Sequence, residues 1–112
     1  MKPGDCEAVA DVVKALSNPS RLRILCVLSD GGELRVSDVV ARTRMRQANV
    51  SIQLGLLRSK GILASRREEV NVYYSIADHR VYEALELLLK VADDHGALNP
   101  STRCRSLRGD VK

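Results

Sequence analysis

The sequence predicts a small, mainly α-helical domain that carries a single β-hairpin. Its 112 residues suit one domain, and 45% of them are hydrophobic. Apolar residues recur with helical spacing on both sides of two short runs, between residues 62 and 76, in which they alternate as in strands. Phe and Trp are absent, so the core must be built from aliphatic side chains.

Two helices are expected before residue 32. The first covers residues 5–16, because Val9, Val12, Val13 and Leu16 recur at helical spacing. The second begins at Pro19 after an Asn18 cap and ends at the Asp30-Gly31-Gly32 sequence. It is apolar nearly all round, which predicts the central buried helix.

The remaining elements complete the order α-α-α-α-β-β-α. We expect a short helix over 38–43 capped by Ser37, a helix over 47–60 closed by Gly61, and a final helix from an Asp78 cap to residue 94. Strands over 62–67 and 70–76 would form a hairpin turning at Glu68-Glu69. Residues 5–94 are thus predicted to be a winged helix-turn-helix DNA-binding and dimerisation domain, and residues 95–112 a flexible basic tail.

The last helix carries more apolar surface than one small domain can cover. Its apolar residues lie on more than one face (Val81, Ala84, Leu85, Leu87, Leu88, Leu89, Val91, Ala92). An uncovered apolar face usually marks an interface, so the first and last helices are predicted to form a two-fold homodimer.

Charge along the chain is uneven although the net charge is only +4. Residues 42–67 hold seven basic and no acidic side chains, which indicates a polyanionic partner. In the helix over 47–60, polar side chains lie off the buried stripe, and Gln or Asn can pair with adenine in the major groove. Double-stranded DNA is the predicted partner, contacted through Arg44, Arg46, Gln47, Asn49, Ser51, Gln53, Arg58, Arg66 and Arg67.

Three segments resemble the ArsR/SmtB family of winged-helix repressors. They are Ala15–Leu25 (ALSNPSRLRIL), Gln47–Leu54 (QANVSIQL) with its exit at Gly61-Ile62-Leu63, and the wing residues Arg66-Arg67-Glu68 and Val72-Tyr73-Tyr74. The resemblance covers residues 8–92 and implies a dimeric repressor that an inducer, often a metal ion or a thiol-reactive species, releases from its operator. The wing differs from the family pattern, because Glu69 and Val70 stand where a Gly and a basic residue are usual.

Two metal sites that the resemblance implies lack their ligands here. Arg35 and Ser37 replace the cysteines of a Cys-x-Cys site, and the helix-five site retains only Asp78 and Asp94. We therefore expect no metal and no cofactor.

The three cysteines are the candidates for sensing. Cys26 occupies the helix-two position of the sulfur-responsive members, but Asp93 stands where a second cysteine would be expected. Cys104, between Arg103 and Arg105, or Cys6 could act as a displaced partner; a buried Cys26 and an idle Cys104 are the alternatives. The inducer, and whether one exists, stays open.

Other classes of function are less well supported by the sequence. The acidic wing tip leaves open a dimerising interaction module that acts through protein contacts without sequence-specific DNA binding. An enzyme is not expected, because no nucleophile motif or phosphate-binding loop is present and neither His79 nor His95 has an evident orienting partner. No apolar run is long enough to cross a membrane, and no secretory signal begins the chain, so a cytoplasmic location is expected.

Overall fold

The computed structural model describes residues 1–95, and it contains five helices and one hairpin in the predicted order. The elements are α1 Asp5–Leu16, α2 Pro19–Gly31, α3 Val36–Thr43, α4 Gln47–Ser59, β1 Leu63–Glu68, β2 Asn71–Ile76 and α5 His79–Asp94. The predicted winged helix-turn-helix fold is therefore confirmed. The predicted tail falls, apart from residue 95, outside the described residues.

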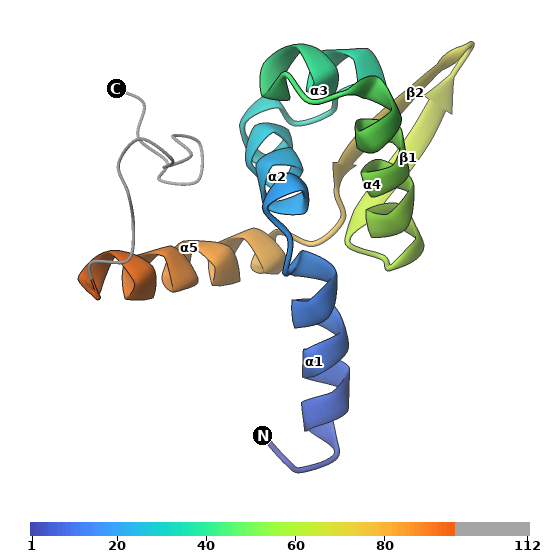
Figure 1. Cartoon of the computed structure of the whole chain (residues 1–112). Coiled ribbons are helices and arrows are strands. Elements are labelled where there is room, and N and C mark those ends of the chain that lie inside the picture. Colours follow the sequence, from blue (N-terminus) through green and yellow to red (C-terminus); the bar gives the residue numbers. More distant parts are fainter. Residues whose placement is uncertain (96–112) are drawn as a thin grey trace.

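The chain divides into a body and two projecting helices. Helices α2, α3 and α4 pack together with the hairpin, whereas α1 and α5 extend away from this body in different directions (Figure 1). Of the described helices, none is both long and apolar enough to cross a bilayer.

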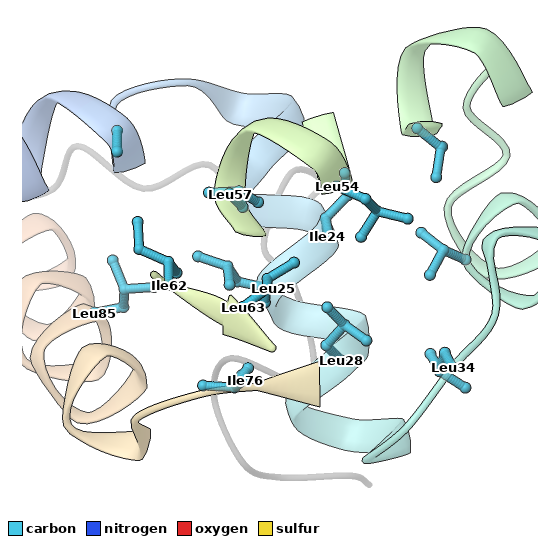
Figure 2. Packing of buried hydrophobic residues seen from close by; sticks show 13 residues of the cluster. Ile24, Leu25, Leu28, Leu34, Leu54, Leu57, Ile62, Leu63, Ile76 and Leu85 are labelled. Carbon is cyan, nitrogen blue, oxygen red and sulfur yellow. The ribbon is translucent and has the colours of Figure 1, made fainter. Parts of the chain in front are cut away.

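Helix α2 lies at the centre of the core, as its nearly uniform apolar character predicts. Ile24, Leu25 and Leu28 are at most 1% exposed, and Figure 2 shows them in the middle of the buried cluster. Helix α4 contributes Val50, Leu54 and Leu57 to the same cluster, whereas the only buried residue of α5 is Leu85. This core fixes α4 against the body and leaves most of α5 outside it.

The hairpin turns one residue later than predicted. Glu68 pairs with Asn71 in the antiparallel ladder, so the turn consists of Glu69 and Val70 rather than Glu68 and Glu69. Glu69 adopts a φ of 59°, a left-handed conformation that costs any residue with a Cβ some energy. The turn residues lack the Gly or Asn that would have marked its position in the sequence.

A third short segment extends the sheet beside β2. Leu34 forms an isolated antiparallel bridge with Tyr74, in which the two residues exchange backbone hydrogen bonds of 3.0 and 2.8 Å. This bridge ties the segment between α2 and α3 to the wing.

Helix α3 begins two residues earlier than predicted, and Ser37 is not its cap. The Asp38 carboxylate accepts a 3.0 Å hydrogen bond from the backbone N–H of Arg35, which makes Arg35 the N-cap. The Arg35 guanidinium also donates to Asp38, and this hydrogen bond lowers the pKa of the carboxyl. A carboxylate at the third helical position can thus set the start of a helix in place of a serine before it.

The other predicted helix ends are confirmed. The Asn18 side chain accepts hydrogen bonds from the backbone N–H groups of Ser20 and Arg21, and Asp78 accepts one from Arg80. The Arg80 guanidinium also donates to Asp78, and these hydrogen bonds lower the pKa of the Asp78 carboxyl to about 2. Gly61 takes a φ of 78° after α4, a conformation that favours glycine.

Candidate nucleic-acid interface

Helices α3 and α4 are joined by a tight turn at Arg44. This residue has a φ of 62°, and its backbone N–H donates a 2.8 Å hydrogen bond to the carbonyl of Val40 at the end of α3. A glycine would adopt this conformation with less strain. The turn lets Val39 of α3 and Val50 of α4 bury themselves in the same core.

Burial of one face of α4 leaves the other face toward solvent. Gln47 and Ser51 are exposed there, as predicted from the sequence, whereas Asn49 and Gln53 are half-buried at the margin. Ile52, which was not among the predicted site residues, is 65% exposed on this outer surface. The sequence could have identified Ile52, because an isoleucine off the buried stripe of its helix does not pack in the core. Apolar side chains of this kind can contact thymine methyl groups.

Hydrogen bonds occupy both ends of the Gln53 amide. Its Oε1 accepts from Arg21 Nε at 2.9 Å, and its Nε2 donates to Asn49 Oδ1 at 3.2 Å. The structure thus brings two predicted DNA-binding residues together and links them to the start of α2. That Gln53 contacts DNA directly stays a prediction.

Exposed arginines surround the outer face of α4. Arg44 and Arg46 precede the helix, Arg58 lies in its last turn, and all three are exposed. Within residues 1–95 none of the three forms an ion pair, whereas Arg42 lies 3.8 Å from Asp30. The cationic charge beside α4 is therefore available to an external anion.

The two wing arginines lie on opposite faces of the hairpin, because successive residues of a strand alternate. Arg67 pairs with Val72 and shares its face with Ser65 and Tyr74. These residues, together with Arg66 and with Arg58 of α4, line a surface groove of about 450 Å³. A groove with an arginine from each wall suits a phosphate backbone.

Arg66 leaves the strand on the other face, yet its side chain also borders the groove, and its guanidinium is bound by carboxylates. Its guanidinium donates two hydrogen bonds of 2.8 and 2.9 Å to Glu33 and one of 2.9 Å to Glu68, and it lies 4.8 Å from the centre of the Tyr73 ring. The hydrogen bond from Arg66 lowers the pKa of the Glu33 carboxyl. Two carboxylates on one guanidinium leave this cluster with a net negative charge. Both arginines were predicted to contact DNA and both border the groove, but among the described residues only Arg66 is held by carboxylates.

The cysteines occupy different environments. Cys6 is exposed at the start of α1, and Cys26 is completely buried within α2. Cys104 lies outside the described residues. In the part of the chain that the structure describes, no group of three or more His, Cys, Asp or Glu residues gathers as a metal site would require.

The projecting helices carry the apolar surface predicted for a dimer. On α1, Val9, Val12 and Val13 are about half exposed. On α5, the exposed fractions are 64% for Leu87, 59% for Leu88 and 53% for Val91. These helices expose more apolar side chains than the rest of the described chain.

Comparison with known proteins places this architecture in a family of regulators. Residues 18–65 match the family model described as bacterial regulatory protein, arsR family. The biofilm growth-associated repressor of Agrobacterium fabrum is 36% identical over 83 residues, which cover 74% of this chain and 70% of that protein. The Synechocystis homologue of the transcriptional repressor SmtB is 39% identical over 93 residues, covering 83% and 67%.

Solved structures agree with the fold. The antimony-specific transcriptional repressor AntR superposes with a TM-score of 0.75 at 33% identity, over 87% of both chains. A homodimeric winged helix-turn-helix DNA-binding domain from Mycobacterium bovis has a TM-score of 0.70 at 36% identity, over 85% of this chain and 90% of that one. The predicted homodimer is consistent with this neighbour. Because these relatives regulate transcription and are not enzymes, and because the matches span most of each chain, the protein belongs to the arsR family of DNA-binding transcriptional regulators.

Proposed function

We propose that the protein is a homodimeric repressor that binds a pseudo-palindromic operator and leaves it when an inducer binds. The observation that carries the proposal is the outer face of α4, where exposed side chains of base-reading type lie among arginines that have no carboxylate partner in residues 1–95. Base-edge contacts would come from α4, while Arg44, Arg46, Arg58 and Arg67 would position the phosphate backbone.

The exposed apolar faces of α1 and α5 support a two-fold dimer with two α4 helices. In helix-turn-helix dimers the two reading helices enter successive major grooves about 34 Å apart. An inducer needs only to favour a dimer geometry in which this spacing is lost.

Salt dependence tests the DNA contact and separates the two wing arginines. The logarithm of the operator affinity falls with the logarithm of the salt concentration. We expect Arg67→Gln to make this slope less steep by about 1, because one phosphate contact is lost. Arg66→Gln should leave the slope unchanged, since its guanidinium is already neutralised by Glu33 and Glu68. The measurement is a fluorescence-anisotropy titration of the operator at several salt concentrations.

The same titration has two contrary outcomes. A wild-type affinity that barely changes with salt would exclude phosphate contacts and contradict the proposal. A dimer that prefers no duplex sequence would instead support the interaction module suggested by Glu68 and Glu69.

For the inducer, we propose a thiol-reactive or sulfur species in preference to a metal ion. The support is the position of Cys26 inside α2 at the centre of the fold, and the lack of a clustered ligand set within residues 1–95. Cys26 is disulfide-bonded and completely buried, so forming or breaking this bond would change the packing of the core, and packed cores respond to small changes in volume. Because Cys6 is a free thiol in the structure, Cys104 is the candidate partner.

Treatment of the purified dimer with a persulfide donor tests this proposal. We expect operator affinity to fall at least tenfold, with mass spectrometry showing a cross-link or polysulfide that includes Cys26. Cys26→Ser should abolish the response, and Cys6→Ser against Cys104→Ser should identify the second cysteine. If affinity is unchanged while the cysteines are modified, thiol sensing is wrong.

A further inference from the structure

A series of hydrogen bonds connects the end of α1 to the outer face of α4. Arg21 Nη1 donates to the carbonyl of Ala15 at 3.2 Å, and Arg21 Nε donates to Gln53 Oε1 at 2.9 Å. Gln53 Nε2 then donates to Asn49 Oδ1 at 3.2 Å. Three side chains from two helices thus form one connected series.

The fold holds Arg21 firmly at the start of this series. Its backbone N–H donates to the Asn18 cap at 3.3 Å, which places it in the first turn of α2. Its guanidinium satisfies a carbonyl in the last turn of α1, where helix carbonyls lack intrahelical partners. The position of Arg21 is therefore set by two helix ends and not by Gln53.

The direction of the series follows from chemistry, because a guanidinium has donors and no acceptor. Facing Arg21, the Gln53 amide can present only its oxygen. The NH₂ group of Gln53 is then the end that faces Asn49, so Asn49 must present its own oxygen to Gln53. Arg21 in this way fixes which end of each amide points where.

We infer that Arg21 is a positioning residue that orients the amides of Gln53 and Asn49. In this orientation Asn49 offers its NH₂ group to DNA and favours guanine. Among the described residues Asn49 Nδ2 donates no hydrogen bond, so both of its protons are available. Guanine presents two acceptors, N7 and O6, in the major groove, whereas adenine presents one acceptor and one donor. The inference rests on the proposed DNA-binding function, and it replaces the adenine contact expected for Asn49 by a guanine contact.

The first test uses the wild-type dimer and the duplex that it selects from a random-sequence pool. Replacing guanine by 7-deazaguanine at single positions removes N7 alone. We expect one position per half-site to lose about tenfold in affinity, the size of one hydrogen bond left unmade. Asn49→Ala should lose the sensitivity at that position and keep the response at others.

The second test reverses the orientation of the Gln53 and Asn49 amides. Glutamate has only acceptors, so Arg21→Glu should turn the Gln53 amide round and leave Asn49 presenting its oxygen. We expect the preferred base at the Asn49 position to change from guanine to one with a donor, such as cytosine. Arg21→Met offers Gln53 neither a donor nor a strong acceptor and so favours neither orientation of its amide. We expect this variant to show little preference among bases at the Asn49 position. Thermal unfolding monitored by circular dichroism checks that both variants are folded.

The outcomes separate the two proposals. Insensitivity of the wild type to 7-deazaguanine at every position overturns the guanine contact. An Arg21→Glu variant that binds more weakly but prefers the same bases in the same order overturns the role of Arg21 in orienting the amides. A wild-type dimer that selects no sequence overturns the proposed function and the base readout together.

Discussion

Replacing Leu54 by Ala is expected to lower the free energy of unfolding by about 2–5 kcal/mol, the usual cost of a cavity at a fully buried leucine. Leu54 has no exposed surface and lies on α4 within the cluster that also contains Ile24 and Leu25 of α2 (Figure 2). Because it joins the reading helix to the body, we expect operator binding to weaken as folded protein is lost. Chemical denaturation gives the unfolding free energy.

Ile52→Ala is the matched control for this prediction. It shortens a β-branched side chain of the same size only two residues away, but this side chain is 65% exposed. Its removal should change the unfolding free energy by less than about 0.5 kcal/mol, as surface substitutions usually do. Equal losses for the two variants would mean that α4 does not pack on the body through its Leu54 face.

Replacing Leu88 by Glu is expected to convert the dimer to monomers and to weaken operator binding at least 100-fold. Leu88 is 59% exposed and belongs with Leu87 and Val91 to the exposed apolar surface of α5, so a carboxylate there would be buried without a partner in the dimer. A dimer binds two half-sites at once, which commonly raises the affinity for DNA by a factor of about 10²–10⁴, and a monomer loses this increase. Analytical ultracentrifugation and anisotropy measure the two effects.

Lys90→Gln provides the control, because it also lowers the net charge by one and lies on the exposed surface of the same helix. We expect it to remain dimeric, with at most a small change in affinity. A dimeric Leu88→Glu variant would contradict the assignment of α5 to the interface.

Much of the fold could be predicted because its determinants are local. Asn18-Pro19 and Gly61 mark the start of α2 and the end of α4 through the conformations that these residue types favour. The alternation of Val72, Tyr74 and Ile76 identifies a strand. The start of α3 and the hairpin turn were misplaced, because Asp38 caps from inside its helix and Glu69 adopts a conformation that glycine usually occupies.

The candidate interface was predicted in outline and changed in detail. Residue type and spacing were sufficient to place polar side chains on α4 and arginines around it. They could not show that Glu33 binds Arg66, since these residues lie 33 positions apart in the chain. Nor could they show that Arg21 reaches Gln53, 32 positions away, although this contact decides how the amides point.

The helices, the hairpin, the buried faces and the concentration of positive charge in residues 42–67 could be predicted from the amino-acid sequence, because they depend on neighbours within a few residues. Which of these charges stay unpaired, and how the half-buried polar groups are oriented, depends on how the folded chain packs. Ion pairs and hydrogen bonds between distant segments arise when the core brings those segments together, and no periodic pattern records them. For this protein, Arg66 and Arg67 show the difference most directly. They are neighbours in the chain and both border the groove with Arg58, but among the described residues only Arg66 is held by two carboxylates.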